Sequence, residues 1–346
     1  MPFEPFEQVP VGQTTLTISR LGFGSASIAG LFSAVSDDQA MAMLQHTWDL
    51  GVRHFDTAPL YGFGLAERRL GGFLRQQPRD SYVLSTKVGR LLRRGTPEEL
   101  AAPAEFHGVT DDRPVWDFSR DGVRRSLDAS LERLGSGRID IVYLHDRDDH
   151  WQQAIDEAYP ALHVLRAQGV IGAIGAGMNQ AEMLSRFVHE ADMDVFLCAG
   201  RYTLLDQSGL VELLPACEAR GSSLVIGGLL NSGILADPSP GARFDYAVAS
   251  PDVLARAQGI REVCERHDVP LLAAAMQFPL AHPRVASILA GVRKPAHLDD
   301  YPPGMRLAIP DALWAYLRAE RLIDPAAPVP TSTVPSTAAR SGPDAG

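Results

Sequence analysis

Four polar side chains occur where β-rich segments of the sequence end, and together they could transfer a proton. Asp56 follows VRHF, Lys87 follows VLST and His145 follows IVYL, while Tyr61 lies shortly after Asp56. Tyrosine has an ordinary pKa of about 10, too high for easy proton exchange at neutral pH, and a lysine ammonium nearby favours the phenolate. An aspartate can keep that lysine charged and aimed, and a histidine can position the substrate oxygen.

These four residues, called the tetrad below, suit hydride transfer at a carbonyl or alcohol carbon, because an oxygen gains or loses a proton as the hydride moves. Each residue alone has an ordinary structural explanation, such as a helix cap, a solvated charge or a packed aromatic ring. Only their convergence at one place would make them a site. We therefore predict Tyr61 as the proton-transfer residue, on the condition that the fold brings the other three residues to it.

Eight short apolar segments alternate with helical patterns along the chain. The predicted strands are residues 19–23, 52–56, 82–88, 139–145, 170–175, 195–199, 222–227 and 285–291. Strands that alternate with helices indicate parallel pairing, in either a doubly wound sheet or a closed barrel, and a count of eight favours the barrel. We therefore expect an α/β fold of the (β/α)8 TIM-barrel type, with functional groups at the C-terminal ends of its strands.

Capping residues mark several helix boundaries. Ser36 and Ser119 are suited to begin helices that Gly51 and Gly135 end. Before the first strand, residues 8–18 alternate around a glycine, which predicts a β-hairpin at the floor of the barrel.

Two segments break the alternation of strands and helices. Residues 90–118 show little periodicity, and a loop of this length in a compact domain is usually functional or disordered. Because this loop follows the third strand, we expect Trp116 and Phe118 to shape the substrate pocket. Residues 324–346 are rich in Pro, Ala, Ser and Thr, so we expect a disordered tail after a single barrel domain over residues 1–323.

The composition of the 346-residue chain, 45% apolar and 21% charged, is that of a globular protein with a sizeable core. The sequence has no apolar stretch of the roughly 20 residues needed to cross a bilayer and no signal-peptide pattern at its start. A formal net charge of −10 argues against nucleic acid or an anionic membrane as partner. Three widely spaced cysteines fit neither a zinc framework nor a disulfide scaffold. We expect a cytoplasmic protein, a monomer or small homo-oligomer, with a small-molecule substrate.

Three segments resemble the catalytic segments of the aldo-keto reductases, in the same order: FDTAPLYG (55–62), STKVG (85–89) and DIVYLHD (140–146). The likeness extends from about residue 21 to residue 298. The family's catalytic aspartate, tyrosine, lysine and histidine fall on the tetrad. The resemblance implies the barrel already inferred, with NAD or NADP bound in an extended form and without a Rossmann domain.

The resemblance also implies a set of cofactor contacts. The positions are Asn179, Gly200, Arg201, Gly227, Asn231, Gly291, Val292, Arg293 and His297. Met178 stands where the family usually has a serine beside the nicotinamide, and glycines stand where it commonly stacks an aromatic residue. Arg293 could accept the 2′-phosphate of NADP, but NADP-preferring members usually carry arginine at the position of His297. Both cofactors fit the resemblance, and we favour NAD.

The stretches AGRYTLLDQ and GGLLNSGIL are similar to those of family members that oxidise sugars at C1, the D-threo-aldose (L-fucose) dehydrogenases, and of pyridoxal 4-dehydrogenase. The resemblance implies oxidation of a sugar to its lactone, with Tyr61 as general base. The alternatives are an NADPH-dependent carbonyl reductase, a pyridoxal dehydrogenase and a cofactor-sensing subunit with poor turnover. The stretch LHDRDDH (144–150) could bind a metal ion, but the first two strands supply too few ligands, so we expect none.

Overall fold

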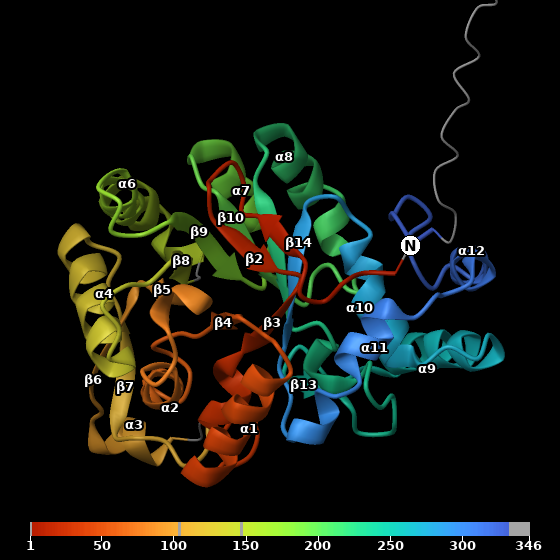
Figure 1. Cartoon of the computed structure of the whole chain (residues 1–346), viewed down its shortest axis with the longest axis horizontal. Helices are drawn as coiled ribbons and strands as arrows, with labels where there is room; N and C mark the ends of the chain where they lie inside the picture. Colours follow the sequence, from red (N-terminus) through yellow and green to blue (C-terminus); the bar gives the residue numbers. More distant parts are fainter. Residues whose placement is uncertain (1, 103–104, 146–147, 332–346) are drawn as a thin grey trace, which may run out of the picture.

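The computed structural model describes residues 2–102, 105–145 and 148–331, and its centre is a closed barrel of eight parallel strands (Figure 1). The strands pair in the order β10-β11-β14-β3-β4-β5-β8-β9. Their bounds are β3 Leu21–Gly24, β4 His54–Asp56, β5 Val83–Val88, β8 Ile141–His145, β9 Ala173–Met178, β10 Val195–Ala199, β11 Ser223–Gly227 and β14 Val285–Ala290. The predicted (β/α)8 barrel is therefore confirmed.

The fifth barrel strand differs most from its predicted position. It was expected over residues 170–175, but β9 begins at Ala173. The preceding residues form a bend, in which the backbone N–H of Gly172 donates to the carbonyl oxygen of Asp140 at 2.8 Å. Strand pairing starts only after this bend, because the Gly172 backbone is already committed to it.

Helices surround the barrel on its outside (Figure 1). They are α1 Asp37–Asp49, α2 Leu65–Leu74, α3 Pro97–Ala101, α4 Arg120–Leu134, α5 Trp151–Gln153, α6 Tyr159–Ala167, α7 Ala181–Glu190, α8 Leu213–Arg220, α9 Pro251–Arg266, α10 Leu271–Leu280, α11 Tyr301–Arg306 and α12 Asp311–Ala319. The predicted caps are confirmed: Ser36 forms a capping box with Gln39, Ser119 accepts from the backbone of Gly122, and Gly135 takes a left-handed conformation after α4.

A hairpin of β1 (Gln8–Pro10) and β2 (Thr17–Ser19) closes one end of the barrel. The backbone N–H of Gly12 donates to Ser223 Oγ at 2.8 Å, at the start of β11, which places the hairpin at the N-terminal ends of the strands. Gly12 has φ +55°, and a Cβ there would meet the Asp194 carbonyl oxygen at 2.5 Å, so the turn requires glycine. The predicted floor hairpin is confirmed.

The segment after β5 is more regular than its sequence suggests. Residues 90–118 were expected to be aperiodic, but β6 (Arg90–Arg94) and β7 (Asp112–Trp116) pair antiparallel, and α3 lies between them. Figure 1 shows this hairpin beside α4, at the periphery of the barrel. Charged residues and Pro114 hide the strand pattern in the sequence, because a two-stranded hairpin buries too little to impose an alternation.

The expected tail is also partly ordered. Residues 324–331 pack on the body of the protein, so the prediction of disorder from residue 324 is wrong for this stretch. The side chain of Ala327 is fully buried, and the carbonyl oxygen of Ala327 accepts from Arg318 at 2.6 Å. The backbone N–H of Asp324 donates to Gln207 Oε1 at 3.2 Å. Residues 332–346 lie outside the described residues.

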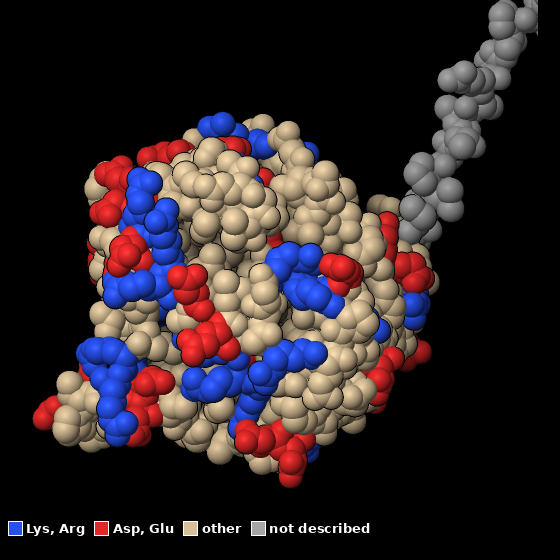
Figure 2. All heavy atoms as spheres, turned by 60° about the vertical axis from the view of Figure 1, so that its left-hand side comes forward, with Lys and Arg blue, Asp and Glu red and all other residues tan. Residues whose placement is uncertain are grey.

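The surface carries charges of both signs. Figure 2 brings the side with α4 and the β6–β7 hairpin forward, and basic and acidic side chains are interspersed on it. The ion pairs Arg93–Glu99 at 2.7 Å and Arg125–Asp121 at 2.9 Å belong to this side. Within the described ranges, no helix combines the length and the apolar character that a membrane span requires.

Candidate active site

The barrel brings the tetrad together at the C-terminal ends of β4, β5 and β8. The Nζ of Lys87 donates to Asp56 Oδ2 at 2.6 Å and to the carbonyl oxygen of Thr57 at 3.0 Å. The Ser85 hydroxyl donates to the other carboxylate oxygen of Asp56 at 2.8 Å. Asp56 is 2% exposed and Lys87 1%, so the ion pair is shielded from water and its geometry is fixed from three sides.

Tyr61 lies in the loop after β4, with its ring among the other three residues. The Nζ of Lys87 is 4.9 Å from the centroid of the Tyr61 ring, and the rings of Tyr61 and His145 meet edge to face at 6.1 Å and 85°. The loop packs closely, since a Cβ at Gly62, which has φ +59°, would lie 2.8 Å from the carbonyl oxygen of Ala29. The loop after β3, to which Ala29 belongs, therefore holds the loop of Tyr61 in place.

Burial dominates the electrostatics of the tetrad. It raises the pKa of Tyr61, and the charge of Lys87 opposes this rise without cancelling it, so the lowering that Lys87 alone predicts is outweighed. Burial also raises the pKa of Asp56, against the pull of Lys87. For Lys87, burial acts to lower the pKa, but Asp56 and Tyr61 leave it above its usual value. Burial, with the charges of Arg90 and Lys87, holds the pKa of His145 well below its usual value. His145 is therefore neutral at neutral pH.

Further polar groups lie buried near the tetrad. The Tyr143 hydroxyl, His54 Nε2 and His145 Nδ1 have no hydrogen-bond partner among the described residues. The Tyr143 ring centroid is 5.8 Å from Lys87 Nζ, and His54 Nδ1 is 3.4 Å from Ser287 Oγ. Burial lowers the pKa of His54 to about 4, with a smaller contribution from the charge of Lys87. Buried polar atoms of this kind are usually satisfied by water or a ligand, and they lie inside the barrel at and below the level of the tetrad.

The positions assigned to the cofactor by resemblance follow four neighbouring strands: β9, β10, β11 and β14. Asn179 comes directly after β9, Gly200 directly after β10, Gly227 ends β11, and Gly291 comes directly after β14. A Cβ at the exposed Gly291 would meet nothing within 4 Å, so this end of the arc is open. The arc is continuous around half of the barrel and suits a long ligand lying across the strand ends.

Two of these positions are engaged by the protein itself. The Asn231 side chain donates to the carbonyl oxygen of Gly200 at 3.0 Å and accepts from Thr203 Oγ1 at 2.6 Å. Both ends of its amide are used, so Asn231 braces the loops after β10 and β11.

The guanidinium of Arg201 is similarly occupied. It donates to the carbonyl oxygen of Asn179 at 2.8 Å and pairs with Asp245 at 2.5 Å and with Asp206 at 3.3 Å. Asp245 belongs to the turn between β12 (Arg243–Phe244) and β13 (Ala247–Val248). Arg201 therefore ties this small hairpin to the loops after β9 and β10.

The end of the arc after β14, where the resemblance predicts the adenosine of the cofactor, is exposed and carries charges of both signs. Val292 is buried, whereas Arg293 and His297 are exposed, and the guanidinium of Arg293 lies 5.6 Å from the ring of Phe32. Asp299 pairs with His46 of α1 at 2.7 Å. Asp299 is thus bound to α1. The guanidinium of Arg293 is a donor of the kind that binds the phosphate or ribose of a dinucleotide.

The aromatic residues predicted to shape the substrate pocket have unequal positions. Phe118 is 2% exposed and packs against Gly89, whereas Trp116 is only partly buried and carries the guanidinium of Arg90 at 3.9 Å. The rings of Trp116 and Phe118 stack at 5.9 Å. Phe118 is therefore buried under the stacked ring of Trp116, and of the two residues Trp116 is the one exposed enough to line a pocket.

Sequence reasoning missed the aromatic contacts of the tetrad with Tyr143, described above, and with Phe106. Phe106 lies 6.3 Å from the ring of Tyr61. Its only signal in the sequence was its place in the long aperiodic segment after the third strand. Of the stretch considered for a metal ion, Asp146 and Arg147 lie outside the described residues.

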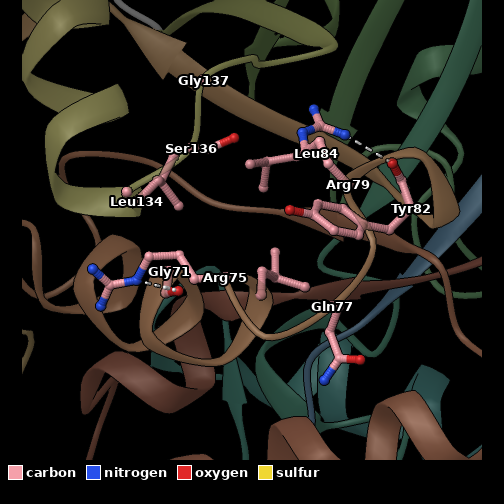
Figure 3. A pocket seen from close by; sticks show the side chains of 11 residues that line it. Gly71, Arg75, Gln77, Arg79, Tyr82, Leu84, Leu134, Ser136 and Gly137 are labelled. Carbon is pink, nitrogen blue, oxygen red and sulfur yellow. Dashed lines mark hydrogen bonds between the residues drawn. The ribbon is translucent and has the colours of Figure 1, made fainter.

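A surface pocket elsewhere does not compete with this site. Figure 3 shows it between the ends of α2 and α4, near the start of β5 and so at the opposite end of the barrel from the tetrad. Its two labelled arginines are engaged locally: Arg79 donates to the Tyr82 carbonyl oxygen at 3.1 Å, and Arg75 to that of Gly71 at 3.2 Å. The chemistry therefore belongs to the rim formed by the C-terminal strand ends.

Comparison with known proteins agrees with this geometry. The profile of the Aldo/keto reductase family matches residues 20–319. The chain is 46% identical to D-threo-aldose 1-dehydrogenase from a Pseudomonas species, over 89% of this chain and 95% of that protein. It is 42% identical to pyridoxal 4-dehydrogenase from Microbacterium luteolum, over 92% and 98%. The fold matches the holo form of aldo-keto reductase AKR11C1 from Bacillus halodurans with a TM-score of 0.75, at 23% identity over 96% of this chain and 99% of that one. The chain belongs to the aldo/keto reductase family and is an NAD(P)-dependent oxidoreductase.

Proposed function

We propose that the protein oxidises an aldose of the D-threo or L-fucose type at C1, giving the lactone, with Tyr61 as the proton-transfer residue. The observation that carries this proposal is the convergence of Tyr61, the buried Lys87–Asp56 pair and neutral His145 at one rim. The similarity to D-threo-aldose 1-dehydrogenase supports the choice of substrate.

The residues divide the work of the reaction. The anomeric hydroxyl of the cyclic sugar donates its proton to the Tyr61 phenolate as the C1–H bond breaks and the carbonyl of the lactone forms. Bound nicotinamide supplies the acceptor for the hydride that leaves C1. Lys87 stabilises the phenolate by its charge, Asp56 keeps Lys87 in place, and His145 positions the reacting oxygen by a hydrogen bond. Tyr61 then returns the proton to solvent.

The raised pKa of Tyr61 sets the pH dependence of this reaction. As general base, Tyr61 must be ionised, so the rate of oxidation increases with pH up to its raised pKa. The same observation favours a second candidate, reduction of an aldehyde or ketone by NADPH, because a tyrosine that is protonated at neutral pH is suited to act as acid. Pyridoxal is a third substrate to test, on the similarity to pyridoxal 4-dehydrogenase.

For the cofactor, we propose Asn179, Gly200, Gly227 and Gly291 as positions along the dinucleotide, with Arg293 at the ribose or its phosphate. Val292 and His297 flank that end, and Asn231 and Arg201 shape the site by holding its loops. We favour NAD over NADP, on the resemblance at His297.

A spectrophotometric screen tests the proposal. L-fucose, D-arabinose and pyridoxal are supplied with NAD⁺ and with NADP⁺ at alkaline pH, and methylglyoxal and an aromatic aldehyde are supplied with NADH and with NADPH at neutral pH. The proposal predicts reduction of the oxidised cofactor by L-fucose, with the lactone as product. Turnover confined to the aldehydes would contradict the proposed substrate class while leaving the tetrad's role intact.

A further inference from the structure

A short segment from the insertion after β5 crosses to the loop after β3. The backbone N–H of Phe32 donates to the carbonyl oxygen of Glu105 at 3.0 Å, and that of His107 donates to Gly30 at 2.9 Å. These bonds form an isolated antiparallel bridge between Leu31 and Phe106. Residues 105–110 are called the arm below.

The contact between the arm and this loop is too close for a side chain at position 30. Gly30 has φ +87°, and a Cβ there would lie 2.1 Å from the carbonyl oxygen of His107. Gly108, in the arm itself, has φ +69°, but its nearest neighbour would be the Ala34 Cβ at 3.7 Å. The two glycines share a backbone conformation, and only Gly30 is required by the docking of the arm.

The docked arm places Phe106 against Tyr61. Phe106 is 7% exposed and belongs to a small apolar cluster, separate from the main core, that includes Ala29, Ala66 and the ring of Tyr61. The Phe106 ring lies 6.3 Å from that of Tyr61, inclined by 35°, and 6.1 Å from that of Phe63, inclined by 64°. Among the described residues, the Tyr61 ring therefore contacts three groups of different kinds: the ammonium of Lys87, the neutral imidazole of His145 and the apolar ring of Phe106.

Of these three neighbours, Lys87 and His145 come from the barrel strands, and only Phe106 comes from the insertion. Phe106 is not a catalytic residue, because its side chain has no group that can exchange a proton. It can act on the reaction only by excluding water from Tyr61 and by confining the ring to the position that faces Lys87 and His145.

We infer that Phe106 is a positioning residue for the partly buried Tyr61, held by the docking of the arm on Gly30, and that it shields one side of the ring from water and keeps the phenol aimed at the substrate oxygen. The inference rests on the proposed role of Tyr61. It assigns the insertion a part in proton transfer as well as in shaping the pocket. Since burial is the largest cause of the raised pKa of Tyr61, admitting water beside the ring lowers that pKa toward its ordinary value.

The test compares two ways of removing Phe106 from Tyr61. Phe106→Ala deletes the ring, and Gly30→Ala displaces the arm while leaving the ring intact. Phe106→Leu retains an apolar side chain, Gly108→Ala introduces the same backbone strain without a collision, and Phe187→Leu alters a buried phenylalanine that packs on Trp151, away from the tetrad. Circular dichroism verifies that each variant is folded.

The first measurement is the pH dependence of sugar oxidation under single-turnover conditions. Phe106→Ala and Gly30→Ala are expected to move the midpoint of the rising limb to lower pH by at least about half a unit, roughly threefold in proton concentration. They should also raise the sugar concentration that gives half of the maximal rate, because the sugar is held less well against a mobile Tyr61. The three other variants should keep the midpoint of the wild type. An unchanged midpoint in Phe106→Ala, or an equal shift in Phe187→Leu, overturns the inference.

A second measurement needs no substrate. The ultraviolet absorbance of tyrosinate is titrated in the wild type and in Phe106→Ala, each with and without Tyr61→Phe, so that the difference isolates Tyr61. A lower midpoint for Tyr61 in Phe106→Ala supports the inference even if no sugar is oxidised, whereas coincident titrations refute it. Failure of the proposed function is visible separately, as full turnover in Tyr61→Phe.

Discussion

Replacing Lys87 by methionine isolates the buried ion pair on which the tetrad depends. The change retains most of the aliphatic stem and removes the charge 2.6 Å from Asp56, with both residues shielded from water. Removal of one partner of a buried pair typically reduces stability by about 3–5 kcal/mol, because the remaining charge is left uncompensated. Asp56 retains its hydrogen bond from Ser85, so we expect a loss near the lower end, about 3 kcal/mol.

A second buried ion pair provides the matched control. Glu67, fully buried, accepts from Arg133 at 2.6 Å and from Thr86 of β5 at 2.8 Å, so this pair joins α2 to α4 and to β5 through partners outside the tetrad. Urea unfolding at neutral pH should show that Lys87→Met and Arg133→Met both lose stability, less in Arg133→Met because that guanidinium is partly exposed. Only Lys87→Met should lose turnover.

The double variant Lys87→Met/Asp56→Asn, which removes both charges, should regain part of the stability and none of the activity. In Lys87→Met any residual rate should increase only at higher pH than in the wild type, because Lys87 lowers the pKa of Tyr61. A Lys87→Met protein within about 1 kcal/mol of the wild type, or an Arg133→Met protein that is equally inactive, would refute the reasoning.

Three further predictions address the surrounding residues. Burial lowers the pKa of His54 to about 4, below its unfolded value of about 6.5, so the stability that neutral His54 contributes is complete above pH 6.5 and is lost as the pH falls toward 4, at about 1.4 kcal/mol per pH unit. The free energy of unfolding in urea, measured at neutral and at acidic pH, should therefore depend less on pH in His54→Gln than in the wild type. An identical pH dependence in the two proteins would contradict this prediction. Asn231→Gly tolerates the φ of +45° but removes the side chain that joins the loops after β10 and β11, so two buried partners lose their hydrogen bonds. Fluorescence titration should show nucleotide binding weakened about tenfold. Unchanged affinity would contradict this role of Asn231. Arg293→Ala should weaken NADP more than NAD, by about tenfold, since a charge-assisted bond to the 2′-phosphate is lost; equal losses would place Arg293 elsewhere.

The barrel and the tetrad were predictable from the sequence for one physical reason. Strands buried on both faces appear as short apolar segments, and closing eight of them in parallel places all their C-terminal ends on one rim. Asp56, Lys87 and His145 end three such segments, so their convergence follows once the barrel is accepted. Local signals also predicted the ends of α1 and α4, because Ser36, Ser119 and Gly135 act within one helical turn.

What the sequence did not predict depends on partners far along the chain. The contact of Phe106 with Tyr61 requires the bridge to Leu31, and no pattern around residue 106 records it. The net direction of the pKa of Tyr61 depends on burial by several loops, which outweighs the single neighbour that sequence reasoning could name. Similarly, residues 324–331 were predicted to be part of a tail because they are rich in Pro and Ala, although Gln207 and Arg318 hold them to the body.

The role of Tyr61 is tested most directly by the rate of cofactor reduction by L-fucose in Tyr61→Phe, measured together with the affinity of the same variant for the nucleotide. If Tyr61 transfers the proton, turnover should fall by about 10²–10⁴-fold, the usual contribution of a general acid–base group, while nucleotide affinity should stay within about twofold of the wild type. A Tyr61→Phe enzyme that oxidises the sugar within a few-fold of the wild-type rate would contradict the assignment of Tyr61 as the proton-transfer residue.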